Sequence, residues 1–223
     1  MAKLKLNQPK TALMAIVILA LFIRVVYVLV APQIDPILRQ NPLHGDASGY
    51  HLLATHLANG AGFSWNGQEP TSYRMPGYPA FAALFYLLFG PNLVPIRLAQ
   101  ALLGALTCIP IFVRAGAVPR DGRRVAVLAA LGAAFHPLML YVTSWLYSET
   151  LFIFLLWVGL WLLLYGLDDN VALRWMLAAG VLFGLATLVR PEVLPLPMLL
   201  FGLGILLRWS RRQLAALLVV QAG

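Results

Sequence analysis

Long runs of apolar residues, separated by short polar or charged stretches, make up most of this chain. A helix needs roughly 20 apolar residues to cross a lipid bilayer, and six runs reach or approach that length. We predict helices at residues 11–31, 93–113, 124–142, 150–167, 173–189 and 192–207. The pattern therefore predicts an all-α integral membrane protein, a single domain over residues 1–223 with about six transmembrane helices.

The two ends of the chain need separate interpretation. The apolar run at 11–31 is too long for the core of a signal peptide, and no small-residue cleavage site follows it, so we expect a helix that is retained. The final residues, QLAALLVVQAG, begin another apolar run and stop well short of a spanning length. We therefore expect a truncated chain, or one that ends as a seventh helix begins.

A long and mostly polar segment, residues 32–92, separates the first two predicted membrane helices. Within it, apolar residues recur at helical spacing after Asp46, which predicts an amphipathic helix ending at Asn59-Gly60. Further along, Asn66-Gly67 favours a tight hairpin turn. The apolar face of the predicted helix consists of Tyr50, Leu53, Ala54, Leu57 and Ala58.

The apolar run at 78–89 is too short to span a bilayer and is bounded by prolines and glycines. Basic residues stay on the cytoplasmic side, and both the N-terminus and the loop at 114–124 are rich in them. Helix 11–31 then leads out and helix 93–113 leads back, which leaves no crossing for 78–89. We predict that this run is a juxtamembrane helix within an outer, periplasmic loop at 32–92.

Composition supports this class of protein, because 61% of the residues are hydrophobic and only 11% are charged. Soluble domains have about a quarter of their residues charged. The net charge of +8 does not indicate nucleic-acid binding, because the arginines cluster in short loops and do not follow one face. In the predicted topology eleven of sixteen basic residues lie inside, whereas five of eight acidic residues lie outside. We therefore expect the chemistry on the outer face.

Asp46 has two interpretations that the residues alone support equally. As the first polar residue before a helix it is a typical N-cap, whose side chain accepts a backbone N–H. As a carboxylate on the outer face it is also a candidate general base. His44 lies close enough in sequence to help Asp46 bind a metal, but a single pair is weak evidence for a metal site.

Outer arginines are the second group of candidates. Arg74 precedes Pro76-Gly77, and Arg190 is followed by Pro191 and Glu192, so each arginine is placed to hold either a phosphate or an ordinary structural partner. Two further arginines lie within predicted helices. Arg97 is expected to snorkel outward, and Arg24 is expected to pair with Asp46 or another outer acid.

Several motifs occur in a characteristic order: GDASGYHLLATHLANGAGFS, SYRMPGYPAFAALFYLLFG, IRLAQALLGALTC, AAFHPLMLYVTSWLYSETLF and GLATLVRPEVLPL. Together they resemble the GT-C superfamily of membrane glycosyltransferases, specifically the family 39 group that contains protein mannosyltransferases and the aminoarabinose and galacturonic acid transferases of lipopolysaccharide. The resemblance covers about residues 11–210.

This resemblance implies a multi-pass inner-membrane enzyme with a cytoplasmic N-terminus and a periplasmic active site. It implies that Asp46 is the general base and that a sugar passes, with inversion, from a polyprenyl-phosphate carrier to an unidentified acceptor. Ala47 stands where many relatives have a second acid, and this departure weakens the case for a metal. No cofactor is certain, and a divalent metal is the one that is possible. A noncatalytic scaffold or carrier-binding subunit is the alternative function. The residues expected to bind substrate or phosphate are Arg74, Arg190, Arg97, Tyr50 and Glu192.

Overall fold

The computed structural model describes residues 10–168 and 172–206, which are almost entirely helical. A single isolated β-bridge, between Ser64 and Pro70, is the one extended pairing in this part of the chain. The helices are α1 (Lys10–Ile34), α2 (Pro36–Gln40), α3 (Asp46–Ala58), α4 (Gly77–Phe89), α5 (Leu93–Leu106), α6 (Cys108–Ala115), α7 (Gly122–Phe135), α8 (Pro137–Thr143), α9 (Glu149–Asp168), α10 (Leu173–Val189), the 3-10 helix η1 (Pro191–Val193) and α11 (Leu196–Leu206).

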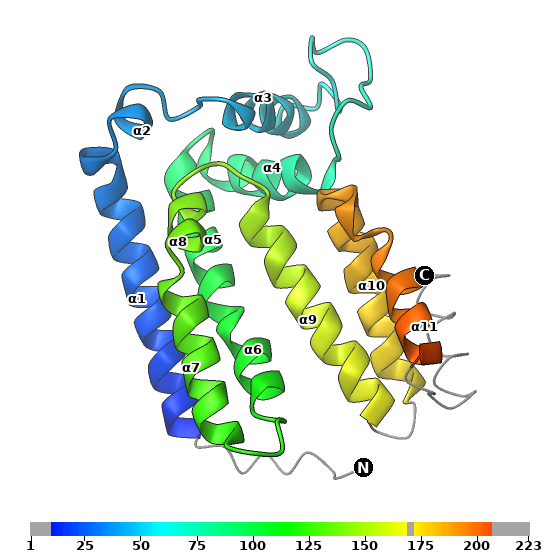
Figure 1. The fold of residues 1–223 in the computed structure, drawn as a ribbon. Helices are drawn as coiled ribbons and strands as arrows, with labels where there is room; N and C mark the ends of the chain where they lie inside the picture. Colours follow the sequence, from blue (N-terminus) through cyan, green and yellow to red (C-terminus); the bar gives the residue numbers. More distant parts are fainter. Residues whose placement is uncertain (1–9, 169–171, 207–223) are drawn as a thin grey trace.

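The helices form two groups that run in different directions (Figure 1). The long helices α1, α5–α6, α7–α8, α9, α10 and α11 stand side by side as a bundle, and α3 and α4 lie across one end of it. We refer to α2, α3, α4 and the loop 59–76 as the cap. The prediction that 78–89 forms a helix that does not run along the bundle is confirmed by the position of α4.

The ends of the bundle alternate as the charge pattern predicts. The end of α1 and the starts of α5 and α9 lie at the cap, whereas the turn between α6 and α7 lies at the opposite end (Figure 1). By length and apolarity, three described helices qualify as membrane spans, namely α1, α5–α6 and α9, and the bent pair α7–α8 makes four. The all-α membrane fold is thus confirmed, and a total of six spans stays a prediction. The described residues do not include residue 207, where the last predicted helix ends, or the final apolar run. They also exclude the basic residues Lys3, Lys5, Arg208, Arg211 and Arg212.

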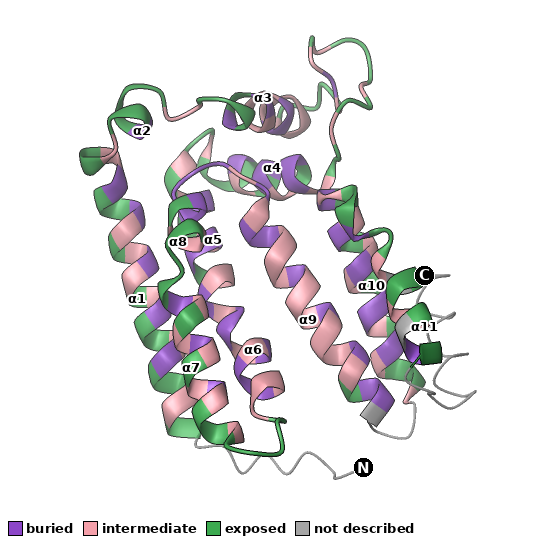
Figure 2. Cartoon of the chain, in the orientation of Figure 1, coloured by how far each residue is buried: buried purple, intermediate pink, exposed green. Residues whose placement is uncertain are grey.

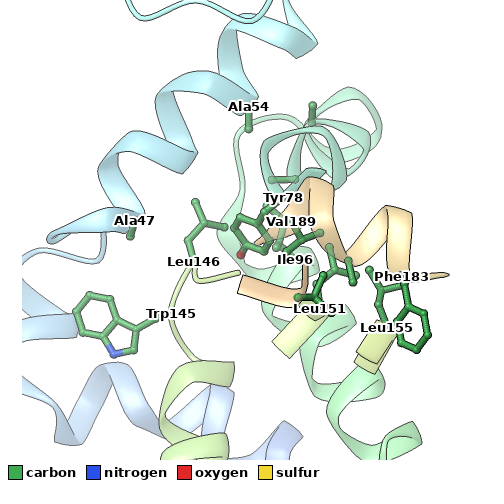
Figure 3. Packing of buried hydrophobic residues seen from close by; sticks show 14 of the residues in the cluster. Ala47, Ala54, Tyr78, Ile96, Trp145, Leu146, Leu151, Leu155, Phe183 and Val189 are labelled. Atoms are coloured by element: carbon green, nitrogen blue, oxygen red, sulfur yellow. The ribbon is translucent and has the colours of Figure 1, made fainter. Parts of the chain in front are cut away.

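One hydrophobic cluster joins the cap to the bundle. The buried face of α3 carries small side chains, which lets α3 lie close over α4. Tyr78 of α4 is completely buried beneath α3 and points toward α5, where its hydroxyl meets the side chain of Gln100. Figure 3 shows labelled members of this cluster from five helices and the connection before α9: Ala47, Ala54, Tyr78, Ile96, Trp145, Leu146, Leu151, Leu155, Phe183 and Val189.

Burial differs between the two sides of the outer helices. α1 is exposed along most of its length and buries one stripe of residues against α5 and α7 (Figure 2). The exposed residues of α1 include Met14, Ile18 and Phe22, which are apolar. In a bilayer such residues face lipid, so the apolar surface agrees with a membrane-spanning helix.

Arg24 lies in the middle of α1 and is buried, with 2% of its surface exposed. It does not pair with an acid, so the expectation that Asp46 or another outer carboxylate neutralises it is wrong. Its guanidinium donates to the carbonyl oxygens of Ala133 and Ala134 at 3.0 Å, and to that of Ala20 in its own helix at 3.2 Å.

The reason for this contact lies at the bend between α7 and α8, which turn by 45° at His136-Pro137. Proline has no N–H to donate to the carbonyl four residues earlier, which is Ala133. Unsatisfied backbone carbonyls are costly where no water is present. Arg24 supplies the missing donors from the neighbouring helix, and so stabilises the bend at His136-Pro137.

Gly104 of α5 gives Arg24 the space that it needs. A Cβ on Gly104 would lie 2.7 Å from Nε and 3.1 Å from Cδ of Arg24, which is inside van der Waals contact. A Cβ on Gly132 of α7 would meet no atom within 4 Å. The two glycines are therefore a matched pair for testing the Arg24 contact.

We predict that Gly104→Ala lowers the thermal unfolding midpoint in detergent, because overpacking of a filled site typically costs about 1–3 kcal/mol. Gly132→Ala should leave the midpoint unchanged or raise it, since alanine is favoured over glycine within a helix by about 1 kcal/mol. Equal midpoints for the two variants would contradict the tight packing of Arg24 against α5.

Candidate active site in the cap

Asp46 is the first residue of α3, but it does not cap that helix. The N-cap is Gly45, which has a positive φ of 62°, and no side chain accepts a hydrogen bond from the first turn. The N-cap interpretation of Asp46 is therefore wrong. Its carboxylate instead turns to the loop 59–76, where Oδ1 accepts a hydrogen bond from Nη2 of Arg74 at 2.8 Å.

Arg74 is the more buried partner, with 20% of its side chain exposed compared with 65% for Asp46. Its guanidinium carbon lies 4.8 Å from the centre of the Tyr50 ring, a cation–π contact one turn along α3. Gly49 provides room, because a Cβ there would lie 3.0 Å from Nε of Arg74 and 2.8 Å from the Trp65 ring. An ion pair this exposed contributes about 1 kcal/mol or less, so its main effect is to orient the carboxylate.

The loop 59–76 is held in shape by the turn that Asn66-Gly67 predicts. The side-chain oxygen of Asn66 accepts hydrogen bonds from the backbone of Gln68 and Glu69, and Gly67 has a φ of 76°. The ring of His56 in α3 contacts the carbonyl of Ser64 at 2.6 Å, which ties the loop to the helix. Arg74 is thus placed by a structured loop.

A second ion-pair group lies where α9 begins and α10 ends. Nη1 of Arg190 contacts Oε1 of Glu149 at 2.7 Å, and Nη2 contacts Oε1 of Glu192 at 3.1 Å. Glu192 is thus a local structural partner of Arg190, one of the two interpretations that the sequence left open for this arginine. The additional link to Glu149 fastens α10 to α9 through residues 41 positions apart.

Tyr147 lies between the two ion-pair groups. Burial raises the pKa of its hydroxyl, and the negative charges of Asp46 and Glu149 raise that pKa further. The hydroxyl of Tyr50 also contacts the hydroxyl of Ser148, at 3.2 Å, which joins α3 to the same connection. The residues that sequence reasoning missed are therefore Tyr147 and Ser148, and their position in the outer turn YSET before a helix was their only signal.

Arg97 belongs to neither ion-pair group. The expectation that it snorkels outward is wrong, because it is 6% exposed. Its Nε and Nη2 atoms are buried and have no hydrogen-bond partner within the described part of the chain. The structure thus brings Asp46, Tyr50 and Arg74 together, places Arg190 with Glu192, and keeps Arg97 apart.

No group of three or more His, Cys, Asp or Glu side chains within residues 10–168 and 172–206 is arranged to hold a metal ion. His44 and Asp46 thus lack a third ligand of these types. The contact that the structure does give Asp46 is with a cation, Arg74.

His51 fastens α3 to α4 on the side facing the bundle. Its Nδ1 lies 2.7 Å from the hydroxyl of Tyr86. Burial lowers the pKa of His51 and raises the pKa of Tyr86. The tyrosine therefore keeps its proton, the imidazole stays neutral, and the two groups share a hydrogen bond between uncharged partners.

Comparison with known proteins gives one positive result. A family model described as dolichyl-phosphate-mannose-protein mannosyltransferase matches residues 69–222. The match includes Arg74, Arg97 and Arg190 and begins after Asp46 and Tyr50. No curated protein and no solved structure matches the chain.

We predict that acid destabilises the cap through His51. Because the pKa of His51 is lower in the folded protein than its ordinary 6.5, its contribution to stability is complete above that value and is lost as pH falls through the lowered pKa. The thermal midpoint should therefore fall more between about pH 7.5 and 5 in the parent protein than in His51→Gln, whose side chain does not titrate in this range. His44→Gln, at an exposed cap position, is the control and should behave like the parent. The same loss of midpoint in all three proteins would refute the assignment.

Proposed function

The chain belongs to the dolichyl-phosphate-mannose-protein mannosyltransferase family, and we propose that it transfers a sugar from a polyprenyl-phosphate carrier to an acceptor at the cap. Membership of the family makes it a membrane glycosyltransferase of the GT-C type. The observation that carries the finer proposal is the Asp46–Arg74 pair, a carboxylate fixed at a helix start and still largely exposed. The other carboxylate oxygen of Asp46, Oδ2, has no hydrogen-bond partner within the described residues.

Asp46 acts as the general base in this proposal. The acceptor hydroxyl or amine gives its proton to the carboxylate as its oxygen or nitrogen attacks the anomeric carbon of the sugar. The bond from that carbon to the phosphate oxygen breaks, and the electron pair leaves with the polyprenyl phosphate. A single displacement of this kind inverts the anomeric configuration.

Arginines stabilise the departing phosphate. Guanidinium groups have five donors in a planar fork, so an arginine that already holds a carboxylate can still bind a phosphate oxygen. Arg74 has a buried Nε with no hydrogen-bond partner in the described structure, and it lies directly beside the proposed base. The ring of Tyr50 contacts the Arg74 guanidinium and helps to hold it in place. Arg190, which contacts Glu149 and Glu192, is the second proposed phosphate ligand.

The cap lies on the outer, periplasmic side of the plasma membrane in this proposal, and the N-terminus is cytoplasmic. Four arginines at the opposite end of the bundle support this orientation, since positive charge is retained on the cytoplasmic side. They are Arg114, Arg120, Arg123 and Arg124. The donor is then a lipid whose sugar has already reached the outer leaflet.

We predict that Asp46→Asn lowers transfer of labelled sugar from a polyprenyl-phosphate donor to membrane acceptors by about 10²–10⁴-fold, the usual contribution of a general base. Glu69→Gln is the matched control, because it removes an exposed carboxylate from the same cap and should retain activity. Full activity of Asp46→Asn would exclude Asp46 as the base. Asp46→Asn should still bind the donor. If the parent protein binds the donor but transfers no sugar, that result would support the noncatalytic alternative.

A second prediction concerns Arg74. Arg74→Ala should weaken binding of polyprenyl phosphate as well as transfer, because a charge-assisted hydrogen bond to phosphate contributes roughly 1.5–3 kcal/mol. Binding is measured with the purified chain in detergent, and Arg123→Ala, which removes an exposed arginine at the opposite end of the bundle, serves as the comparison for general loss of positive charge. Unchanged affinity for polyprenyl phosphate in Arg74→Ala would assign Arg74 to positioning Asp46 alone.

A further inference from the structure

A cavity of about 230 Å³ lies inside the helical bundle. Its walls come from α1, α5–α6, α7–α8 and α9, which stand side by side (Figure 1). Along α9 the cavity extends from Thr150, in the first turn below the cap, to Trp157, which is about 10 Å further along that helix. No residue of the Asp46–Arg74 or Arg190–Glu149 groups lines it, so it is separate from the candidate active site.

Two polar side chains that line this cavity are buried and incompletely bonded. Arg24 is 2% exposed, and its Nε has no hydrogen-bond partner in the described part of the chain. Thr150 is 6% exposed, and its hydroxyl oxygen likewise has none among the described residues. The other buried side-chain atoms without a partner belong to residues that do not line the cavity, namely Arg74, Arg97, Trp145 and Trp175.

Two more threonines place hydrogen-bond acceptors on the cavity wall. The hydroxyl of Thr107 donates to the carbonyl of Leu103 at 2.8 Å, and that of Thr143 donates to the carbonyl of Met139 at 2.6 Å. A hydroxyl that donates its one proton still has lone pairs that accept. The cavity therefore offers a donor at Arg24, acceptors at Thr107 and Thr143, and a hydroxyl at Thr150 that serves as either.

These groups specify what the cavity binds. A buried polar group without a partner is costly in an apolar surrounding, and Arg24 carries a full charge with no acid beside it. The occupant must both accept from Arg24 and donate to the threonine oxygens. A hydrocarbon chain does neither, and an anion only accepts. Water does both, and one molecule needs only about 10–15 Å³ and two to four polar partners.

We propose that this cavity binds a small cluster of water molecules that links Nε of Arg24 on α1 to the hydroxyl of Thr150 on α9. The remaining nitrogens of Arg24 hold the carbonyls at the α7–α8 bend. The water cluster thereby connects the bend to α9, the helix whose first residue, Glu149, binds Arg190. It involves no residue of the proposed sugar transfer and is independent of that activity.

Radiolytic labelling of the full chain in lipid nanodiscs locates such water directly. X-rays turn water into hydroxyl radicals, which oxidise the side chains beside each water molecule, and mass spectrometry identifies the oxidised residues. Met139 and Trp157 line the cavity and carry oxidisable side chains. Met176 of α10 is the control, because it is fully buried and does not line the cavity. We expect Met139 and Trp157 to be oxidised several-fold faster than Met176.

Thr150→Val provides a second measurement, in which the direction of the change is decisive. Valine matches threonine in shape but has no hydroxyl. If water binds that hydroxyl, the variant loses a hydrogen bond, and the thermal midpoint should fall by about 2–4 °C for a chain of this size. Thr187→Val is the matched control, because that hydroxyl bonds within α10, away from the cavity, and its loss should change the midpoint little.

Either of two results would overturn the proposal. One is oxidation of Met139 and Trp157 no faster than that of Met176, which would show that hydrocarbon occupies the cavity. The other is a higher midpoint in Thr150→Val, because removing a buried hydroxyl that has no partner stabilises the fold. The labelling uses the parent chain, so it decides the outcome even if Thr150→Val does not fold.

Discussion

The cost of an unsatisfied polar group in an apolar surrounding governs this structure. Arginines are the clearest case, because a guanidinium keeps its charge at every accessible pH. Nη1 and Nη2 of Arg24 are satisfied inside the bundle because they donate to backbone carbonyls beside the bend at Pro137. The same constraint places the polar segment 32–92 outside the bundle, where α3 covers α4 and its own polar side remains exposed. The cap lies across the end of the bundle because this polar segment cannot enter the bilayer.

This arrangement positions the candidate base. α3 lies flat because its buried face carries small residues, and its first residue then stands at the edge of the cap beside the end of the loop 59–76. Arg74 is held by the turn at Asn66 and by the ring of Tyr50, so the direction of the Asp46 carboxylate depends on the whole cap. The connection through Tyr147 and Ser148 then brings the cap into contact with the start of α9.

The sequence predicted most of the fold because apolar periodicity and charge reflect local chemistry. The amphipathic helix after Asp46, its end at Asn59 and the short helix at 78–89 are all present. The partners of the charged residues could not be predicted, because the pairing of Arg74 with Asp46 spans 28 positions and that of Arg190 with Glu149 spans 41. Local reasoning therefore left Asp46 open as a helix cap, paired Arg24 with an acid, and let Arg97 reach solvent. For Asp46 and Arg24 a tertiary contact replaced the nearest available one, whereas Arg97 is buried by the packing of the helices.

The central claim is that the cap, with its carboxylate and its arginines, faces the outside of the cell. Labelling of single cysteines in intact cells by a membrane-impermeant maleimide tests this most directly, in a chain whose one native cysteine is replaced by Cys108→Ala. Gln68→Cys places the thiol on the exposed part of the loop 59–76, and Ala117→Cys places it in the turn at the opposite end of the bundle. The structure and the charge distribution predict labelling at position 68 in intact cells and at position 117 only after the cells are permeabilised. Labelling at 117 in intact cells, with protection at 68, would contradict the account.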